Sequence, residues 1–174
     1  ANRNFEIAMR VHLDHDAVVD AIHPRLSALG DSGGAGGVLI VPVVYATTSS
    51  PSPAKNTSAF CSQAPAGHVL PGSWQPQRLV AKGPATKFTA AANATVWARL
   101  PLMAPTPLTA GTYWIGFLSA GDLNCFADVT PPGGKAAPLD FYALRSFSSG
   151  PGLGPELSWV EGSSSVAIYA STKS

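Results

Sequence analysis

Two tryptophans lie in segments rich in turn-forming residues: Trp74 in "PGSWQPQR" and Trp159 in "ELSWVEG". A tryptophan in such a segment has less reason to join a core than one inside a strand, so its ring can face solvent. A flat aromatic ring can stack on the C–H face of a pyranose, while polar side chains beside it bind the sugar hydroxyls. Trp74 and Trp159 are therefore predicted to be platforms for a carbohydrate.

Four polar residues could bind the hydroxyls if the fold brings them to the tryptophans. They are Asn124, Asp128, Tyr142 and Arg145, which occur in "NCFAD" and "DFYALRSF". The alternative interpretation is structural: Trp74 covers a loop, and Arg145 pairs with Asp140 or Glu156. The sequence alone leaves both interpretations open.

Groups suited to catalysis are scarce. The glutamates Glu6, Glu156 and Glu161 form no motif that pairs an acid with a base, as glycoside hydrolysis needs. The G-x-S-x-G pattern of many serine hydrolases is also absent. A lyase that uses His, Tyr and Arg would leave little local signature, so His68, Tyr142 and Arg145 keep that alternative open. The balance favours a protein that is not an enzyme.

The segment "HLDHD", residues 12–16, raises the question of a metal site. His12 and His15 have no third ligand close in sequence, and the aspartates lack the spacing, the glycine and the terminal glutamate of a calcium loop. We expect a solvated strand end here and no cofactor. A structural calcium held by scattered carboxylates and carbonyls stays open.

Cysteines and glycosylation sequons indicate an extracellular protein. Cys61 and Cys125 lack the close spacing of a zinc or redox motif, so a disulfide is predicted. It would close a loop of roughly 65 residues and stabilise the fold by about 3–4 kcal/mol. The sequons "NTS" at Asn56 and "NAT" at Asn93 favour the same compartment. The first ten residues show no secretory signal pattern, so any signal peptide is expected to have been removed.

Composition predicts one domain, residues 1–174, built from many short strands. Only 12% of the residues are charged, and 17 glycines with 16 prolines suit tight turns better than solvated helices. The net charge of +1 shows no excess of basic residues of the kind that binds nucleic acid or an acidic membrane surface. No apolar run approaches the roughly 18 residues of a spanning helix.

Alternation of apolar side chains predicts where strands lie. Residues 5–13, "FEIAMRVHL", place every second side chain on an apolar face and therefore predict a half-buried strand. Residues 14–30 are ambiguous, because their apolar positions also fit a helical stripe. Pro24 would cost about 3 kcal/mol inside a helix. We therefore prefer a strand that tolerates Pro24 at an edge or a bulge.

The stretch "GTYWIGFLSAGDLNCFAD", residues 111–128, predicts the centre of a sheet. Its first half is apolar on both faces, as in a strand between two layers. Ile115 and Phe117 are expected in the core, while Trp114 or Tyr113 could still face a groove. Together with the segments "VLIVPVVYA", "TVWARLPL" and "SVAIYAST", it suggests about nine to eleven strands. The predicted fold is all-β, a two-sheet antiparallel β-sandwich of jelly-roll type.

The pattern "PLTAGTYWIGFLSAG", with "ATVWARLPLMAPTPL" before it and "SVAIYAST" near the end, resembles a secreted β-sandwich module of bacterial and algal polypeptides. In these carbohydrate-binding-module-like domains the central strand reads "AGTYWLG". The resemblance covers residues 5–171. It implies a jelly-roll-like sandwich placed beside polysaccharide-active or cell-surface segments.

These observations predict an extracellular or cell-surface module that binds polysaccharide or glycoprotein glycans, or that packs within a glycoprotein coat. The first alternative is a polysaccharide lyase on the same scaffold. The second is a structural or adhesion module that binds other extracellular proteins, with exposed tryptophans as interface anchors.

Overall fold

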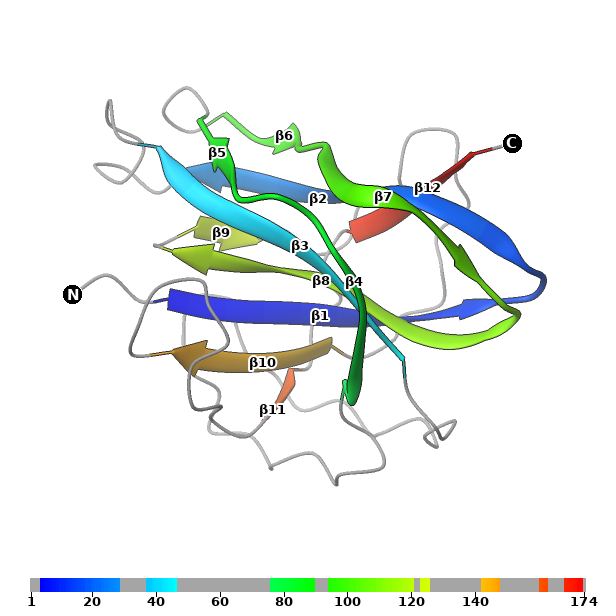
Figure 1. Cartoon of the computed structure of the whole chain (residues 1–174). Coiled ribbons are helices and arrows are strands. Elements are labelled where there is room, and N and C mark those ends of the chain that lie inside the picture. The colour runs from blue at the N-terminus through cyan, green and yellow to red at the C-terminus, as the bar shows by residue number, and fades with distance from the viewer. Residues whose placement is uncertain are drawn as a thin grey trace.

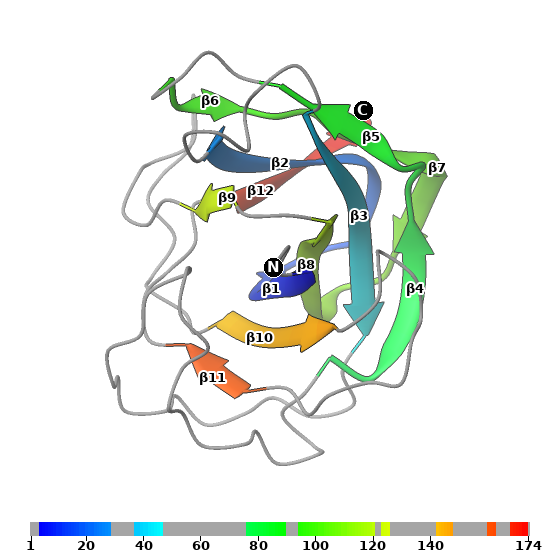
Figure 2. The same ribbon diagram turned by 90° about the vertical axis from the view of Figure 1, so that its left-hand side faces the viewer.

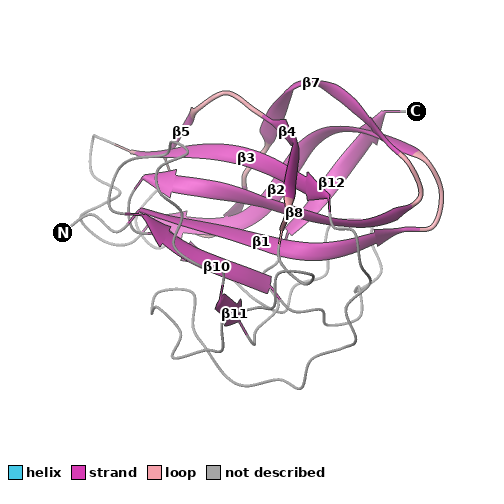
Figure 3. Ribbon diagram, turned by 60° about the horizontal axis from the view of Figure 1, so that its bottom comes forward, coloured by secondary structure: helices cyan, strands magenta, loops and turns pink. Residues whose placement is uncertain are grey.

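The computed structural model describes residues 4–28, 37–46, 76–89, 94–120, 123–125, 142–147, 160–162 and 168–173. These residues form twelve strands and no helix (Figure 3). The strands are β1 (Asn4–Leu13), β2 (Ala17–Ala28), β3 (Val38–Ala46), β4 (Arg78–Lys82), β5 (Thr86–Phe88), β6 (Val96–Trp97), β7 (Leu100–Leu108), β8 (Gly111–Ala120), β9 (Leu123–Cys125), β10 (Tyr142–Phe147), β11 (Val160–Gly162) and β12 (Ile168–Lys173). The described part of the chain therefore offers no helix that could cross a membrane.

The strands form two antiparallel sheets, which confirms the predicted all-β sandwich (Figure 1). The larger sheet has the order β11-β10-β1-β8-β3-β4, and β5 also pairs with β3. In the smaller sheet β2 is central, with β12 and β9 along one side and β7 and β6 along the other. The chain crosses between the two sheets repeatedly. Figure 2 shows the smaller sheet above β1, β8 and β10.

The core lies between the two sheets and follows the predicted alternation. Ile7 and Met9 of β1 pack with Ile115 and Phe117 of β8 against Ile22 of β2. All five are buried, and Phe117 is 0% exposed. The assignment of Ile115 and Phe117 to the core is confirmed. Non-directional burial of this kind is the main force that holds the two layers together.

Strand β8 is the centre of the larger sheet, between β1 and β3. Its register requires close approach at Gly116, where an added Cβ would lie 2.0 Å from the Ile7 carbonyl oxygen. Trp114 lies on the opposite face from Phe117 and is 0% exposed, so it does not face a groove. It packs with Ala8 and Tyr45 in a second apolar cluster.

Residues 17–28 form a strand, as preferred from the sequence, but the expected place of Pro24 was wrong in detail. Strand β2 is central rather than at an edge, and the sheet irregularities of β2 lie between Val19 and Ala21. The Ala98 amide donates to the Pro24 carbonyl at 2.9 Å, and Pro24 has no N–H to return the bond. The neighbouring strand is interrupted at this level, which divides the predicted strand at 95–102 into β6 and β7.

Candidate functional site

Most of the residues predicted for the site lie outside the described residues. These are Trp74, Trp159 and Asp128, together with His68, Cys61, Asn56 and Asn93. Asn124 and Cys125 belong to β9 in the smaller sheet, whereas Tyr142 and Arg145 belong to β10 in the larger sheet. The register sets position 142 opposite Met9 and position 145 opposite Glu6, so these two positions fall on opposite faces. The proposed grouping of these residues stays a prediction.

The structure instead brings together a set of polar and aromatic residues on the outer face of the smaller sheet. We call this set the outer-sheet patch: Asp20, His23, Arg25, Trp97, Arg99, Tyr169 and Ser171. They come from β2, from the β6–β7 segment and from β12. These three segments are far apart in the sequence, so the patch exists only in the folded chain.

Strand pairing explains why these side chains share a face. His23 lies opposite Tyr169 of β12, and Arg25 lies opposite Trp97 of β6. Directly opposed residues of an antiparallel pair project to the same side of the sheet. Leu26, which follows Arg25, is turned inward and is fully buried in the core. The patch is therefore the solvent side of strands whose other side builds the core.

A β-bulge releases Asp20 from both neighbouring ladders. The pairing with β12 passes from Ala21 directly to Val19, and the pairing with β7 shifts at the same place. Bulges of this kind redirect a side chain. The Asp20 carboxylate accepts a hydrogen bond from Ser171 Oγ at 2.6 Å and one from Arg99 at 3.0 Å. Asp20 thereby links β2 to β12 on one side and to the segment between β6 and β7 on the other.

Three rings form a continuous aromatic group in the patch. The His23 and Tyr169 rings are stacked, with centroids 4.5 Å apart and an interplanar angle of 4°. The Trp97 ring meets Tyr169 edge to face, at 5.1 Å and 65°. Each aromatic pair of this kind contributes about 0.5–1.5 kcal/mol beyond its buried area. All three residues are only half-buried, so the group remains accessible to a ligand.

The hydrogen-bond chain fixes the protonation of the polar residues. The hydroxyl of Ser171 and then the guanidinium of Arg99 hold the pKa of Asp20 below its usual value, so the carboxylate only accepts. The Ser171 hydroxyl must therefore be the donor of the hydrogen bond to Asp20. Ser171 Oγ then accepts from His23 Nε2, which lies 3.0 Å away. Partial burial, aided by the charge of Arg99, lowers the pKa of His23 and keeps it neutral at pH 7.

This arrangement contains Ser, His and Asp, but not in the order that activates a nucleophile. In a hydrolytic triad the histidine lies between the serine and the aspartate and removes the serine proton. Here Ser171 lies between His23 and Asp20, and its hydroxyl already donates a hydrogen bond to the carboxylate. The geometry suits a rigid surface for recognition better than an attacking serine.

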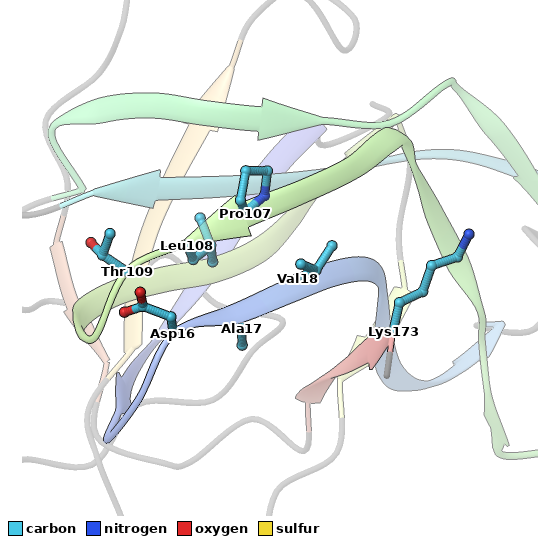
Figure 4. A pocket seen from close by; sticks show the side chains of 7 residues that line it. All are labelled: Asp16, Ala17, Val18, Pro107, Leu108, Thr109 and Lys173. Atoms are coloured by element: carbon cyan, nitrogen blue, oxygen red, sulfur yellow. The ribbon is translucent and has the colours of Figure 1, made fainter.

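A hollow lies at one end of the sandwich (Figure 4). It has a volume of about 430 Å³ and is lined by Asp16, Ala17, Val18, Pro107, Leu108, Thr109 and Lys173. Asp16 Oδ1 accepts a hydrogen bond from the Ala110 amide at 2.8 Å, so this carboxylate holds the turn between β7 and β8. Asp14 and His15 are exposed in the adjoining turn, as expected for a solvated strand end. Within the described ranges, no group of three or more His, Cys, Asp or Glu could hold a metal ion.

Comparison with protein-family models, with curated proteins and with solved structures finds no match to this chain. The class of protein is therefore defined by its own residues: an all-β sandwich of two antiparallel sheets, with an aromatic and polar patch outside the smaller sheet. The resemblance to a secreted carbohydrate-binding type of module extends, in the described residues, to this strand-rich architecture.

Proposed function

We propose that this protein is an extracellular, non-catalytic module that binds glycans through the outer-sheet patch. The observation that carries the proposal is the contiguity of three accessible rings with a fixed network of polar groups. Trp97 and Tyr169 supply apolar faces and edges for a pyranose ring. Arg99, Asp20 and Ser171 supply groups that bind hydroxyls. The binding surface thus differs from the one expected at Trp74 and Trp159.

Preorganisation supports recognition of a small polar ligand. The side chains of Asp20, His23 and Ser171 are held by one another, so little rotational freedom is lost when a ligand binds. A protein partner would instead favour a large apolar centre. Among the described residues, the large exposed apolar side chains Val18, Leu39, Val96 and Met103 are spread over four strands. They do not form such a centre.

The extracellular location rests on sequence features alone. Cys61 and Cys125 suit a disulfide, and Asn56 and Asn93 are glycosylation sequons. The weakly charged composition of the chain, with 12% charged residues, is compatible with this location. Intact-mass measurement of the secreted protein, with and without glycosidase and reductant, tests both features directly.

A glycan array followed by calorimetric titration of the best ligand tests the proposed function. We expect binding to weaken about tenfold or more in Trp97→Ala and in Tyr169→Ala, since buried aromatic anchors dominate such contacts. Met103→Ala is the matched control, because Met103 is 71% exposed and lies outside the patch. Binding that survives both patch variants but disappears in Trp74→Ala or Trp159→Ala would support glycan binding and place the binding site at that tryptophan instead of at the patch. Absence of glycan binding would contradict the function.

A polysaccharide lyase is the second candidate, and the patch itself favours it over other enzymes. Neutral His23 stacks on Tyr169, and Arg99 lies in the same network. A neutral imidazole or a tyrosine can remove the proton beside a uronate carboxylate, while an arginine neutralises that carboxylate. The C–O bond to the departing sugar then breaks as the C=C bond forms, and the released oxygen takes up a proton. Growth of ultraviolet absorbance from an unsaturated product would support this activity. His23→Gln should then abolish turnover while leaving ligand binding measurable.

A further inference from the structure

The charges of the outer-sheet patch are not balanced. Two arginines, Arg25 and Arg99, face a single acidic residue, Asp20, among the residues described in this patch. Arg99 forms an ion pair with Asp20 at 3.0 Å. Arg25 forms no ion pair with any of the residues whose side chains the structure describes. The patch therefore carries a net positive charge while the whole chain is nearly neutral, at +1.

The negative charge of Asp20 is also turned away from a ligand. Oδ1 accepts from Ser171 and Oδ2 accepts from Arg99, and the side chain is only 18% exposed. The Arg99 side chain is 59% exposed, and a guanidinium has five N–H donors. Within the described part of the chain Arg99 donates to Asp20, and most of its donors have no partner there, so they can bind an incoming group. A ligand would meet guanidinium groups rather than the carboxylate.

Both arginines occupy positions next to Trp97 on the same face of the sheet. Arg25 is the register partner of Trp97, and Arg99 follows Trp97 by two residues. The register continues at Leu100, which lies opposite Ile22, so Arg99 is level with His23. A pyranose stacked on Trp97 would place its ring substituents within reach of a guanidinium on either side. Planar guanidinium groups bind carboxylate and sulfate oxygens in paired hydrogen bonds.

We infer that the outer-sheet patch selects pyranose units that carry a negative charge, on a carboxylate or a sulfate ester, over neutral units of the same ring. This inference rests on the proposed glycan-binding function and makes it specific. The carboxylate and the sulfate share one chemistry, a planar or tetrahedral oxyanion that accepts paired hydrogen bonds from Arg25 or Arg99.

Isothermal titration with matched ligands tests the inference. A galacturonate oligosaccharide is compared with its fully methyl-esterified form, and a sulfated galactan oligosaccharide with its desulfated form. Within each pair the sugar rings and their linkages are the same, and the charged group is replaced by a neutral methyl ester or by a hydroxyl. We expect the charged member to bind about tenfold more tightly or better, since charge-assisted hydrogen bonds are roughly twice as strong as neutral ones. Preference within only one pair identifies the source of the charge and still supports the inference.

Variants assign the preference to the arginines. Arg25→Gln should reduce the preference for the charged member severalfold and flatten its dependence on salt, while Arg25→Lys should retain part of both. Lys87→Gln is the control, because Lys87 is exposed on β5 in the other sheet. Circular dichroism verifies that each variant folds.

The possible failures are distinguishable. Equal affinity for charged and neutral members would overturn the inference and leave the proposed function intact. Absence of binding to any of the four oligosaccharides, together with a blank glycan array, would overturn both. A charge preference that is unchanged in Arg25→Gln and in Arg99→Gln would show that the patch does not select the charge.

Discussion

Ser171 donates its hydroxyl proton to Asp20 across 2.6 Å, and this hydrogen bond joins β12, near the C-terminus, to the bulge of β2. The two residues are 151 positions apart in the sequence. The contact also orients the His23 ring through Ser171 Oγ. The Ser171 hydroxyl therefore links the Asp20 carboxylate to the His23 ring within the outer-sheet patch.

Ser171→Ala should loosen this link. A hydrogen bond to a charged group contributes about 1.5–3 kcal/mol, so the free energy of unfolding should fall by an amount within or just below that range. Because Ser171 is the main cause of the low pKa of Asp20, that pKa should rise. Urea unfolding measures the first effect and carbon NMR of the carboxyl group the second. Thr172→Ala, at the exposed neighbouring position, should change neither quantity.

Acidification should destabilise the fold in two steps. The pKa of His23 is lower in the folded chain, so the unfolded chain binds more protons in the interval below about pH 6.5. The contribution of neutral His23 to the free energy of unfolding should therefore be fully present above that interval and decrease as the pH drops through it. Asp20 also has a lowered pKa, so its contribution is present above about pH 3.9 and is lost as the pH falls through its folded pKa.

Urea unfolding measured across this pH range checks the two steps. In His23→Gln the upper step should disappear while the lower step remains. A stability that increases between pH 7 and pH 5 would contradict the assigned neutral state of His23.

Phe117→Ala should be among the most destabilising substitutions in the core. Its side chain is 0% exposed and packs between the two sheets. Removal of a buried phenylalanine leaves a cavity and costs about 3–5 kcal/mol. Chemical denaturation should show this loss, whereas Met103→Ala, at an exposed position, should stay within about 0.5 kcal/mol of the parent protein.

Gly116→Ala should disrupt the larger sheet. The added methyl group would lie 2.0 Å from the Ile7 carbonyl oxygen and 2.7 Å from the Ala8 Cα atom. Both are backbone atoms, so no side-chain rotation can make room. We expect a loss of at least about 1–3 kcal/mol, as for an overpacked core, visible as a lower melting temperature. Adding Ala8→Gly should not restore stability, since the closest clash is with the backbone of β1. A fully stable double variant would refute this account.

The two-layer fold could be predicted from the sequence, because apolar residues alternate along segments such as β1 and β8 and mark the face that is buried. Ile7, Ile115 and Phe117 are in the core as alternation indicated. The central position of β2 was not predicted, since a proline ordinarily marks an edge. That inference failed because the neighbouring strand is interrupted at Ala98, where a regular ladder would require a hydrogen bond from the N–H that Pro24 lacks.

The outer-sheet patch was missed for a different reason. The sequence predicts exposed rings for tryptophans in turn-rich segments, whereas Trp97 lies in a segment that predicts an ordinary strand. One signal was available: Trp97 and Arg99 alternate with Ala98 and Leu100, which places a ring and a charge on the same face. The pairing of that face with Tyr169 and Ser171 depends on long-range register, which alternation within one segment cannot specify.

The absent N–H of Pro24 has a consequence that reaches beyond strand pairing. Since Ala98 and Arg99 belong to neither β6 nor β7, the backbone at Arg99 is released from the hydrogen-bonding pattern of a regular strand. The Arg99 side chain extends from this gap to Asp20, which is itself released by a bulge. The bulge at Asp20 and the strand interruption at Arg99 thus lie next to each other. The ion pair of the patch forms where both strands depart from regular β-structure.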